Sequence, residues 1–224
     1  IVLLKNANNL LPLDEQKYKK VLVTGINAND QNIMGDWSEL QPEEKVWTVL
    51  RGLKSVSPTT EFNFVDQGWD PRNMSQAKVD EAVEAAKNSD LNIVCCGEYM
   101  MRFRWNDRTS GEDTDRDNLE LVGLQEQLIR RLNETGKPTI VIIISGRPLS
   151  VRYAAEKVPA IINAWEPGQF GGQAIAEILY GKVNPSAKLA MTIPRHVGQI
   201  STWYNHKRSA FFHPAVCADN TPLY

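Results

Sequence analysis

The chain has 224 residues, of which 42% are hydrophobic and 23% are charged, and its formal net charge is −2. This composition is ordinary for a globular protein with one large or two small domains. No run of Lys and Arg forms a basic stripe, and no apolar run approaches the roughly 20 residues that span a bilayer, so we expect neither a nucleic-acid partner nor a membrane span.

The first segment, IVLLKNANNLLPL, is strand-like and lacks an initiator methionine. We interpret the chain as a fragment or a processed product, so the absence of a signal peptide says nothing about its compartment. Short apolar segments that predict strands follow at residues 18–25, 61–66, 91–97, 139–146, 160–168 and 188–194. Most of them lack strict alternation, which favours strands buried on both faces of a mostly parallel sheet.

Helical spacing occurs between these segments, at residues 43–54, 75–88, 121–132 and 174–180, and Ser75 can cap the second helix. Alternation of strand and helix predicts an α/β fold, a three-layer sandwich with helices on both faces of the sheet. We expect this domain to cover residues 1–200. Residues 201–224 show little periodicity, which predicts an irregular extension that packs on the domain or on a missing partner domain.

Ligands of such folds bind beyond the carboxyl ends of the strands, which directs attention to residues 25–38, 97–118, 145–148 and 165–172. The first of these loops contains neither G-x-G-x-x-G nor a P-loop, so a nucleotide site is disfavoured. The third, SGRP, lacks the G-x-S-x-G of serine hydrolases. Its Arg147 can fix a carboxylate or hold a loop, and holding a loop is the commoner case.

The second loop is unusually long, about twenty residues against a typical median of roughly 4–6. It combines Tyr, Phe, Trp and Arg with carboxylates, as a sugar-binding surface does, although composition alone favours a solvated charge run. A carboxylic acid in a partly dry pocket can protonate a leaving oxygen near neutral pH. Before this loop, the adjacent Cys95 and Cys96 fit neither a disulfide framework nor a zinc site. We expect both in the core, and no metal or cofactor.

Six segments are decisive when taken together and in order: IVLLKNANNLLPL, GINANDQNIMGDWS, SGEDTDRDNLEL, GKPTIVIIISGRPLSV, PAIINAWEPGQFGGQAIAEILYGKVNPSAKL and TIPRHVGQISTWYNHK. With them the chain closely resembles the second domain of family 3 glycoside hydrolases, the β-glucosidase and β-xylosidase group. It departs from the family at Ala187, where glycine is usual, and at Ser201, where proline is usual.

The resemblance implies a retaining, β-glucosidase-like exo-glycosidase that hydrolyses β-O-glycosidic bonds. An N-terminal barrel domain of the same polypeptide would carry an aspartate nucleophile, and this chain would supply the acid/base. The family's GE-x-x-DR pattern falls on residues 111–116, which carries the acid/base role to Glu112. Trp37 matches a tryptophan that flanks the leaving-group subsite in some members.

Other expectations complete this interpretation. We expect Glu98 and Arg104 to contact an oligosaccharide or β-glucoside substrate, and Arg116 and Arg147 to support the site. Family members of this architecture are often exported, which indicates a periplasmic or secreted protein. Because the barrel lies outside this sequence, we expect the chain alone to be inactive.

Three alternatives stay open at this stage. Glu98 and Glu112 could form a carboxylate pair within this chain, but Glu98 is as easily a loop anchor. The domain could be a non-catalytic carbohydrate-binding or scaffold domain. It could also be a receiver-like or flavodoxin-like binding module, for which the first loop offers no clear acidic pocket or phosphate loop.

Overall fold

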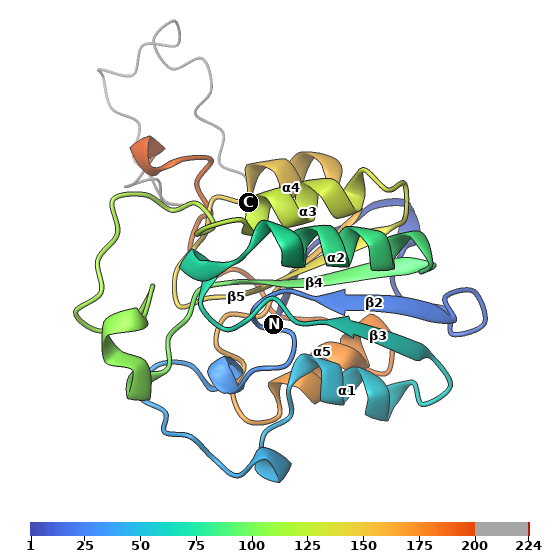
Figure 1. Cartoon of the computed structure of the whole chain (residues 1–224), viewed down its shortest axis with the longest axis horizontal. Coiled ribbons are helices and arrows are strands. Elements are labelled where there is room, and N and C mark those ends of the chain that lie inside the picture. The colour runs from blue at the N-terminus through green and yellow to red at the C-terminus, as the bar shows by residue number, and fades with distance from the viewer. Residues whose placement is uncertain (200–223) are drawn as a thin grey trace, which may run out of the picture.

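A six-stranded sheet runs through the middle of the computed structural model, which describes residues 1–199 and 224 (Figure 1). Its spatial order is β1-β6-β5-β4-β2-β3. Neighbouring strands are parallel, except that β1 runs antiparallel to β6. The strands are β1 (Val2–Asn6), β2 (Lys20–Thr24), β3 (Glu61–Val65), β4 (Leu91–Gly97), β5 (Thr139–Ile144) and β6 (Ala160–Asn163).

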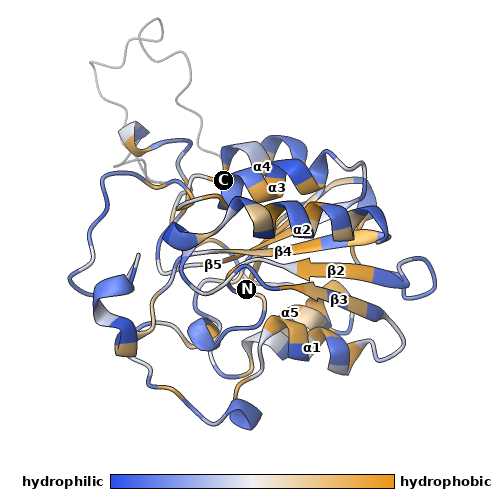
Figure 2. Ribbon diagram, viewed as in Figure 1, coloured by the Kyte–Doolittle hydropathy of each residue, from blue (hydrophilic) through white to orange (hydrophobic). Residues whose placement is uncertain are grey.

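The central strands are apolar on both sides because helices cover both faces of the sheet. Every residue of β4, β5 and β6 is buried. Cys95 belongs to the core on one face and Cys96 to the core on the other, as expected for core residues on a strand. Figure 2 shows this as hydrophobic strands between helices whose outer faces are hydrophilic.

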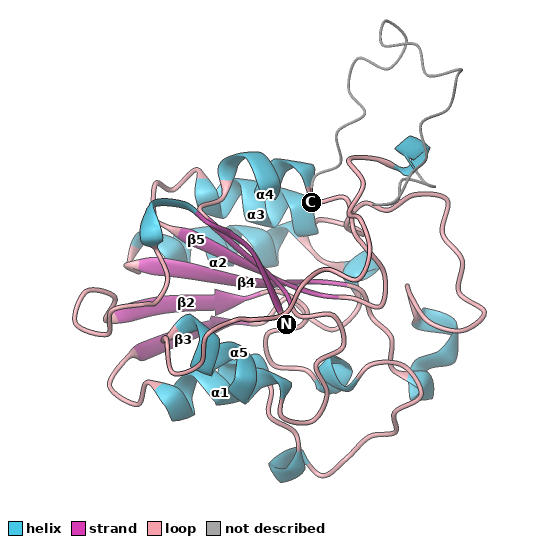
Figure 3. Cartoon of the chain, turned by 180° about the vertical axis from the view of Figure 1, so that it is seen from behind, coloured by secondary structure: helices cyan, strands magenta, loops and turns pink. Residues whose placement is uncertain are grey.

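The helices form the two outer layers of the predicted three-layer sandwich, which the structure confirms (Figures 1 and 3). One face is covered by α1 (Val49–Val56) and α5 (Gly171–Leu179), and the other by α2 (Gln76–Lys87), α3 (Gln125–Asn133) and α4 (Arg152–Lys157). Helices α1 and α5 approach backbone to backbone, because a Cβ at Gly52 would collide with the carbonyl of Gly172.

Local capping explains where two of the helices begin. Ser75 Oγ accepts the Lys78 N–H and starts α2, as predicted, and Val79, Ala82 and Ala86 form its buried face. The helix predicted from residue 43 begins only at Val49. Residues 43–45 form a separate 3-10 turn, and Thr48 caps α1 by accepting the Arg51 N–H.

Two sequence predictions differ from the structure in other places. Residues 188–194 do not form a strand: Met191 is exposed, and the Ile193 N–H bonds to the carbonyl of Tyr224 instead of to a strand of the sheet. The helix predicted from residue 121 begins at Gln125, after Gly123 in the left-handed region. Helix α4 was not predicted.

The predicted extension at residues 201–224 lies outside the described residues except for Tyr224, so the domain boundary at residue 200 stays a prediction. In the part of the chain that the structure describes, no helix has the length and apolar character needed to cross a membrane.

Candidate functional site at the carboxyl edge of the sheet

The loops that follow β2, β4, β5 and β6 emerge at one edge of the sheet because these strands are parallel. Glycines allow the backbones to meet there. A Cβ at Gly25 would collide with the carbonyl of Cys95, and a Cβ at Gly97 with that of Ile144. Asn32 joins two loops, since its Nδ2 donates to the Glu98 carbonyl and its Oδ1 accepts the Met100 N–H, both at 2.6 Å. Close backbone packing and the hydrogen bonds of Asn32 therefore fix the loops at the base of the site.

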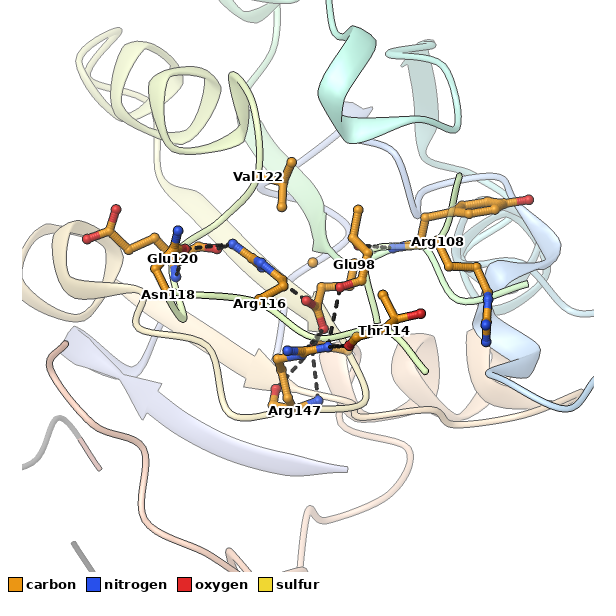
Figure 4. Close-up of polar contacts among 12 residues, drawn as sticks. Glu98, Arg108, Thr114, Arg116, Asn118, Glu120, Val122 and Arg147 are labelled. Carbon is orange, nitrogen blue, oxygen red and sulfur yellow. Dashed lines mark hydrogen bonds and ion pairs between the residues drawn. The ribbon is translucent and has the colours of Figure 1, made fainter. Parts of the chain in front are cut away.

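Glu98 lies at the centre of a polar cluster that we call the buried junction, formed by Glu98, Arg116, Ser145 and Arg147. Figure 4 shows Glu98 with Arg116 and Arg147 directed toward it. The Glu98 side chain is 0% exposed. Its Oε1 accepts from Arg116 Nη1 at 3.0 Å, and its Oε2 accepts from Ser145 Oγ at 2.8 Å and from Arg147 Nε at 3.2 Å. Both carboxylate oxygens are thus engaged within the protein.

The two arginines of the buried junction extend from Glu98 into the long loop. Arg147 Nη2 donates to the carbonyls of Thr109 and Thr114, and Arg116 Nη2 donates to the carbonyl of Glu120. We predicted that Arg116 and Arg147 support the site and that Glu98 contacts substrate. The structure buries the Glu98 side chain completely and leaves those of Arg116 and Arg147 12% and 20% exposed, and the contacts of Glu98 fit the loop-anchor alternative.

Glu112 lies further out, in a group that we call the rim cluster: Asp36, Trp37, Arg102, Trp105, Arg108 and Glu112. The Glu112 side chain is 48% exposed, and its Oε2 accepts from Arg102 Nη1 and Nη2 at 3.2 and 3.1 Å. Its backbone is held more firmly. The Glu112 N–H donates to Asp36 Oδ2 at 2.9 Å, and its carbonyl accepts from Arg108 Nη2 at 2.7 Å.

Asp36 is the charged centre of the rim cluster. Its side chain is 11% exposed, and its Oδ1 accepts from the Trp37 N–H at 2.8 Å and from Arg108 Nη1 at 3.1 Å. Burial raises the pKa of Asp36, but the N–H groups of Glu112 and Trp37 and the charges of Arg108 and Arg102 outweigh burial, so the pKa lies below its ordinary value. The carboxylate is therefore a stable anion.

Aromatic side chains flank the carboxylates. The guanidinium carbon of Arg102 lies 3.4 Å from the ring centroid of Trp37 and 4.7 Å from that of Trp105, so the two rings and Glu112 share one arginine. Trp37 is 70% exposed and has a positive φ of 59°. Strained backbone of this kind gathers at functional sites. The structure thus brings the predicted Trp37 and Glu112 together and leaves an aromatic face open to a ligand.

Arg104 belongs to neither cluster. Its guanidinium carbon lies 3.9 Å from the ring centroid of Trp69, and the residue lines a separate pocket of about 320 Å³ with Asp30 and Tyr99. Burial raises the pKa of Asp30, while the charge of Arg104 opposes that effect. The predicted substrate contact of Arg104 is therefore not assembled with Glu112 in this structure.

Sequence reasoning missed Asp36, Arg102, Arg108 and Glu166. The Glu166 carboxyl lies beside Gly146, where a Cβ would be only 2.7 Å from Oε1. Although the residue as a whole is exposed, partial burial of its carboxyl raises its pKa, and the charge of Asp36 raises it further. The sequence contains one feature that could have indicated Asp36 and Glu166. Both residues lie in loops that follow parallel strands, where ligands of such folds bind.

The arrangement can exchange a proton with a ligand oxygen at Glu112 while an aromatic face at Trp37 contacts the ligand. Within residues 1–199 and 224, no three His, Cys, Asp or Glu side chains gather so as to hold a metal ion. Proton transfer by a carboxyl group is the chemistry that these side chains offer.

Comparison with known proteins finds relatives that are glycosidases. It is 40% identical over 212 residues to a β-xylosidase of Formosa agariphila, covering 91% of this chain and 28% of that protein. It is 35% identical over 228 residues to the periplasmic β-glucosidase of Salmonella typhimurium, covering 92% of this chain and 28% of that protein. The chain thus spans just over a quarter of the length of these relatives.

The solved structures that this chain resembles include β-glucosidases. A β-glucosidase from Erythrobacter marinus matches with a TM-score of 0.83 and 34% identity, over 100% of this chain and 32% of that one. A β-glucosidase from Listeria innocua in complex with isofagomine matches with a TM-score of 0.81 and 30% identity, over 93% of this chain and 27% of that one. The family model for the glycosyl hydrolase family 3 C-terminal domain matches residues 1–224. The chain therefore belongs to glycosyl hydrolase family 3, as a C-terminal domain of that family.

Proposed function

We propose that this domain supplies Glu112 as the acid/base carboxyl of a retaining β-glycosidase, and that the aspartate nucleophile comes from a barrel domain of the same polypeptide. The observation that carries the proposal is the setting of Glu112. Its backbone is bonded at both the N–H and the carbonyl, while its side chain is 48% exposed at the carboxyl edge of the sheet and shares Arg102 with the exposed Trp37.

The chemistry requires two carboxyl groups roughly 5–5.5 Å apart, one that attacks the anomeric carbon and one that protonates the leaving oxygen and then activates water. Glu112 takes the second role. A pair formed by Glu98 and Glu112 is disfavoured, because both oxygens of Glu98 are engaged by Arg116, Ser145 and Arg147 in the interior. The substrate then occupies the space between Glu112 and the barrel.

The substrate class follows from the relatives. We propose a β-glucoside or β-xyloside cleaved from the chain end, because the similar proteins include both β-glucosidases and β-xylosidases. Trp37 stacks on the sugar of the leaving group in this proposal. We also propose that the protein is exported, which the similarity to a periplasmic β-glucosidase supports.

The test compares leaving groups in the intact protein that carries this domain. Glu112→Gln removes the proton donor, so kcat for substrates with poor leaving groups should fall about 10²–10⁴-fold. Activated aryl glycosides need no protonation to depart, and their bond-breaking step should lose far less. Asp115→Asn is the matched control, since it removes one carboxylate from the same exposed loop.

Equal loss on both substrate types, or no loss, would refute the acid/base role. The non-catalytic alternative predicts sugar binding without turnover by any form of the protein. Turnover by the 224-residue chain alone, abolished by Glu112→Gln, would instead favour a carboxylate pair within this domain.

A further inference from the structure

We propose that Asp36 is the positioning residue that fixes Glu112 for proton transfer, an inference that rests on the proposed function. Asp36 lies on the loop after β2 and is 76 residues from Glu112 in the sequence. The two residues nevertheless meet at the carboxyl edge of the sheet. No sequence motif joins them. In this role Asp36 does not contact the substrate and acts only through Glu112.

The first contact is direct. Asp36 Oδ2 accepts the Glu112 N–H at 2.9 Å. Gly111, which precedes it, has a φ of +119°, and a Cβ there would lie only 2.6 Å from Asp36 Oδ2. The peptide that leads into Glu112 is thus packed against the Asp36 carboxylate, so Glu112 cannot pivot about this peptide without breaking the hydrogen bond.

Two further contacts run through arginines that Asp36 pairs with. Arg108 Nη1 donates to Asp36 at 3.1 Å, while its Nη2 donates to the Glu112 carbonyl at 2.7 Å. Arg102 Nη1 lies 3.5 Å from Asp36 Oδ1 and 3.2 Å from Glu112 Oε2. Asp36 therefore acts on the N–H, the carbonyl and the carboxylate of Glu112, directly or through one intermediate cation.

The contacts between Asp36 and Glu112 are separate from those that stabilise the base of the loops. The buried junction ties the long loop to the sheet through Glu98, and Asn32 ties it to the loop after β2. Asp36 contributes to neither set of contacts. Its loss should therefore displace Glu112 while leaving the contacts at the base of the loops in place, and misplacement of a catalytic group by about 1 Å can cost on the order of 10²-fold in rate.

The experiment uses Asp36→Asn in the intact protein, because asparagine keeps the shape but loses the charge and one acceptor. We expect kcat for substrates with poor leaving groups to fall by up to about 10²-fold. Activated aryl glycosides should be affected less, as with Glu112→Gln. In the Glu112→Gln background, Asp36→Asn should cause no further selective loss, because residues that act as one unit are not additive.

Asp70→Asn is the matched control. Asp70 is 9% exposed and accepts the Arg72 N–H at 2.9 Å and Asn73 Nδ2 at 2.6 Å, so the substitution removes a similarly buried carboxylate that also accepts a backbone N–H but lies outside the rim cluster. It should leave the ratio of the two substrate rates unchanged. If Asp36→Asn fails to fold, Asp36→Glu keeps the charge while displacing the carboxyl, and the same selective loss is expected.

A merely structural role for Asp36 predicts equal loss on both substrates, additive with Glu112→Gln, and that result would overturn the inference. The two proposals fail in distinguishable ways. If Glu112→Gln itself shows no dependence on the leaving group, the proposed function fails and this inference falls with it. If Glu112→Gln shows that dependence and Asp36→Asn does not, the positioning role alone is refuted.

Discussion

The buried junction and the rim cluster use the same residue types in opposite ways. In the junction, Arg116 and Arg147 bind the Glu98 side chain, which is 0% exposed. In the rim cluster, Arg108 and Asp36 bind the backbone of Glu112, and its carboxylate accepts from Arg102 through Oε2. The protein thus holds one glutamate by its side chain and the other by its main chain. The second arrangement leaves the Glu112 side chain 48% exposed, with Arg102 as its partner.

Burial decides how much each ion pair contributes to stability. Breaking a buried pair by removing one partner typically costs about 3–5 kcal/mol, because a charge is left uncompensated in the interior. An exposed pair contributes about 0–1 kcal/mol, since water screens it. Stability measurements should therefore separate Glu98, which is 0% exposed, from Glu112, which is 48% exposed, although each pairs with arginine.

The largest effect is expected for Glu98→Gln. The substitution leaves Arg116 and Arg147, whose side chains are 12% and 20% exposed, without their counter-charge. We expect the free energy of unfolding to fall by about 3 kcal/mol or more. Urea denaturation of the chain, followed by circular dichroism, measures this as a lower midpoint at an unchanged slope.

Glu112→Gln is the control for that experiment, and it should change the free energy of unfolding by less than about 1 kcal/mol. A comparable loss for both variants would show that the pair of Glu112 with Arg102 also stabilises the fold, and the distinction between the two glutamates would then be wrong. A negligible loss for Glu98→Gln would contradict the anchoring role of Glu98.

The sequence predicts the sheet and helix α2 better than the contacts between the loops, for a physical reason. Strands buried on both faces leave a near-continuous apolar pattern, and Ser75 is a local cap, so the sheet and α2 could be predicted. The partners of a loop carboxylate depend on which loops meet at the sheet edge. Asp36 and Glu112 are 76 residues apart, and no local pattern records their contact.

The same limit applies to individual residues. Glu98 directly follows a strand, as a substrate contact would, and its burial depends on arginines of two other segments. Glu112 was predicted from its motif and not from its surroundings. The apolar segment at residues 188–194 predicts a strand on composition, but Ile193 bonds to Tyr224 instead.

A smaller effect is expected when Gly111 is replaced by alanine. Its φ of +119° strains any other residue, and the new Cβ would lie 2.6 Å from Asp36 Oδ2 and 2.8 Å from Arg108 Nη1. We expect about 1–2 kcal/mol of lost stability from the backbone. Displacement of Asp36 should add a selective fall in the hydrolysis of substrates with poor leaving groups, measured on the intact protein.

Gly68→Ala distinguishes the effect of backbone strain from the effect of displacing Asp36. Gly68 also has a positive φ, +77°, but a Cβ there would meet nothing within 4 Å. Its replacement should cost a similar free energy of unfolding, by guanidinium denaturation, without changing the preference between leaving groups. If Gly68→Ala lowered turnover in the same selective way, backbone strain in general, and not contact with Asp36, would explain the Gly111 result.

The smallest expected effect is on the pH dependence of stability, to which Glu166 and Asp36 should contribute with opposite signs. Partial burial, and then the charge of Asp36, raise the pKa of Glu166 above its ordinary value of 4.5, so the unfolded chain loses this proton first. The stability present below pH 4.5 is lost as the pH rises through the folded pKa. Glu166→Gln cannot ionise, so its Tm should exceed that of the parent at pH 7 and converge with it at acidic pH.

Asp36 should behave in the reverse manner, because its net pKa lies below the ordinary value of 3.8. Its ionised form stabilises the fold above that pH, and the contribution is lost as the pH falls through the folded pKa. Asp36→Asn should therefore lower the Tm at pH 7, with the difference shrinking in acid. Tm values for both variants across this range test the pair together. Shifts of the same sign would show that the carboxyls of Asp36 and Glu166 do not differ in environment, so the rim cluster would not hold Asp36 as its stable anion.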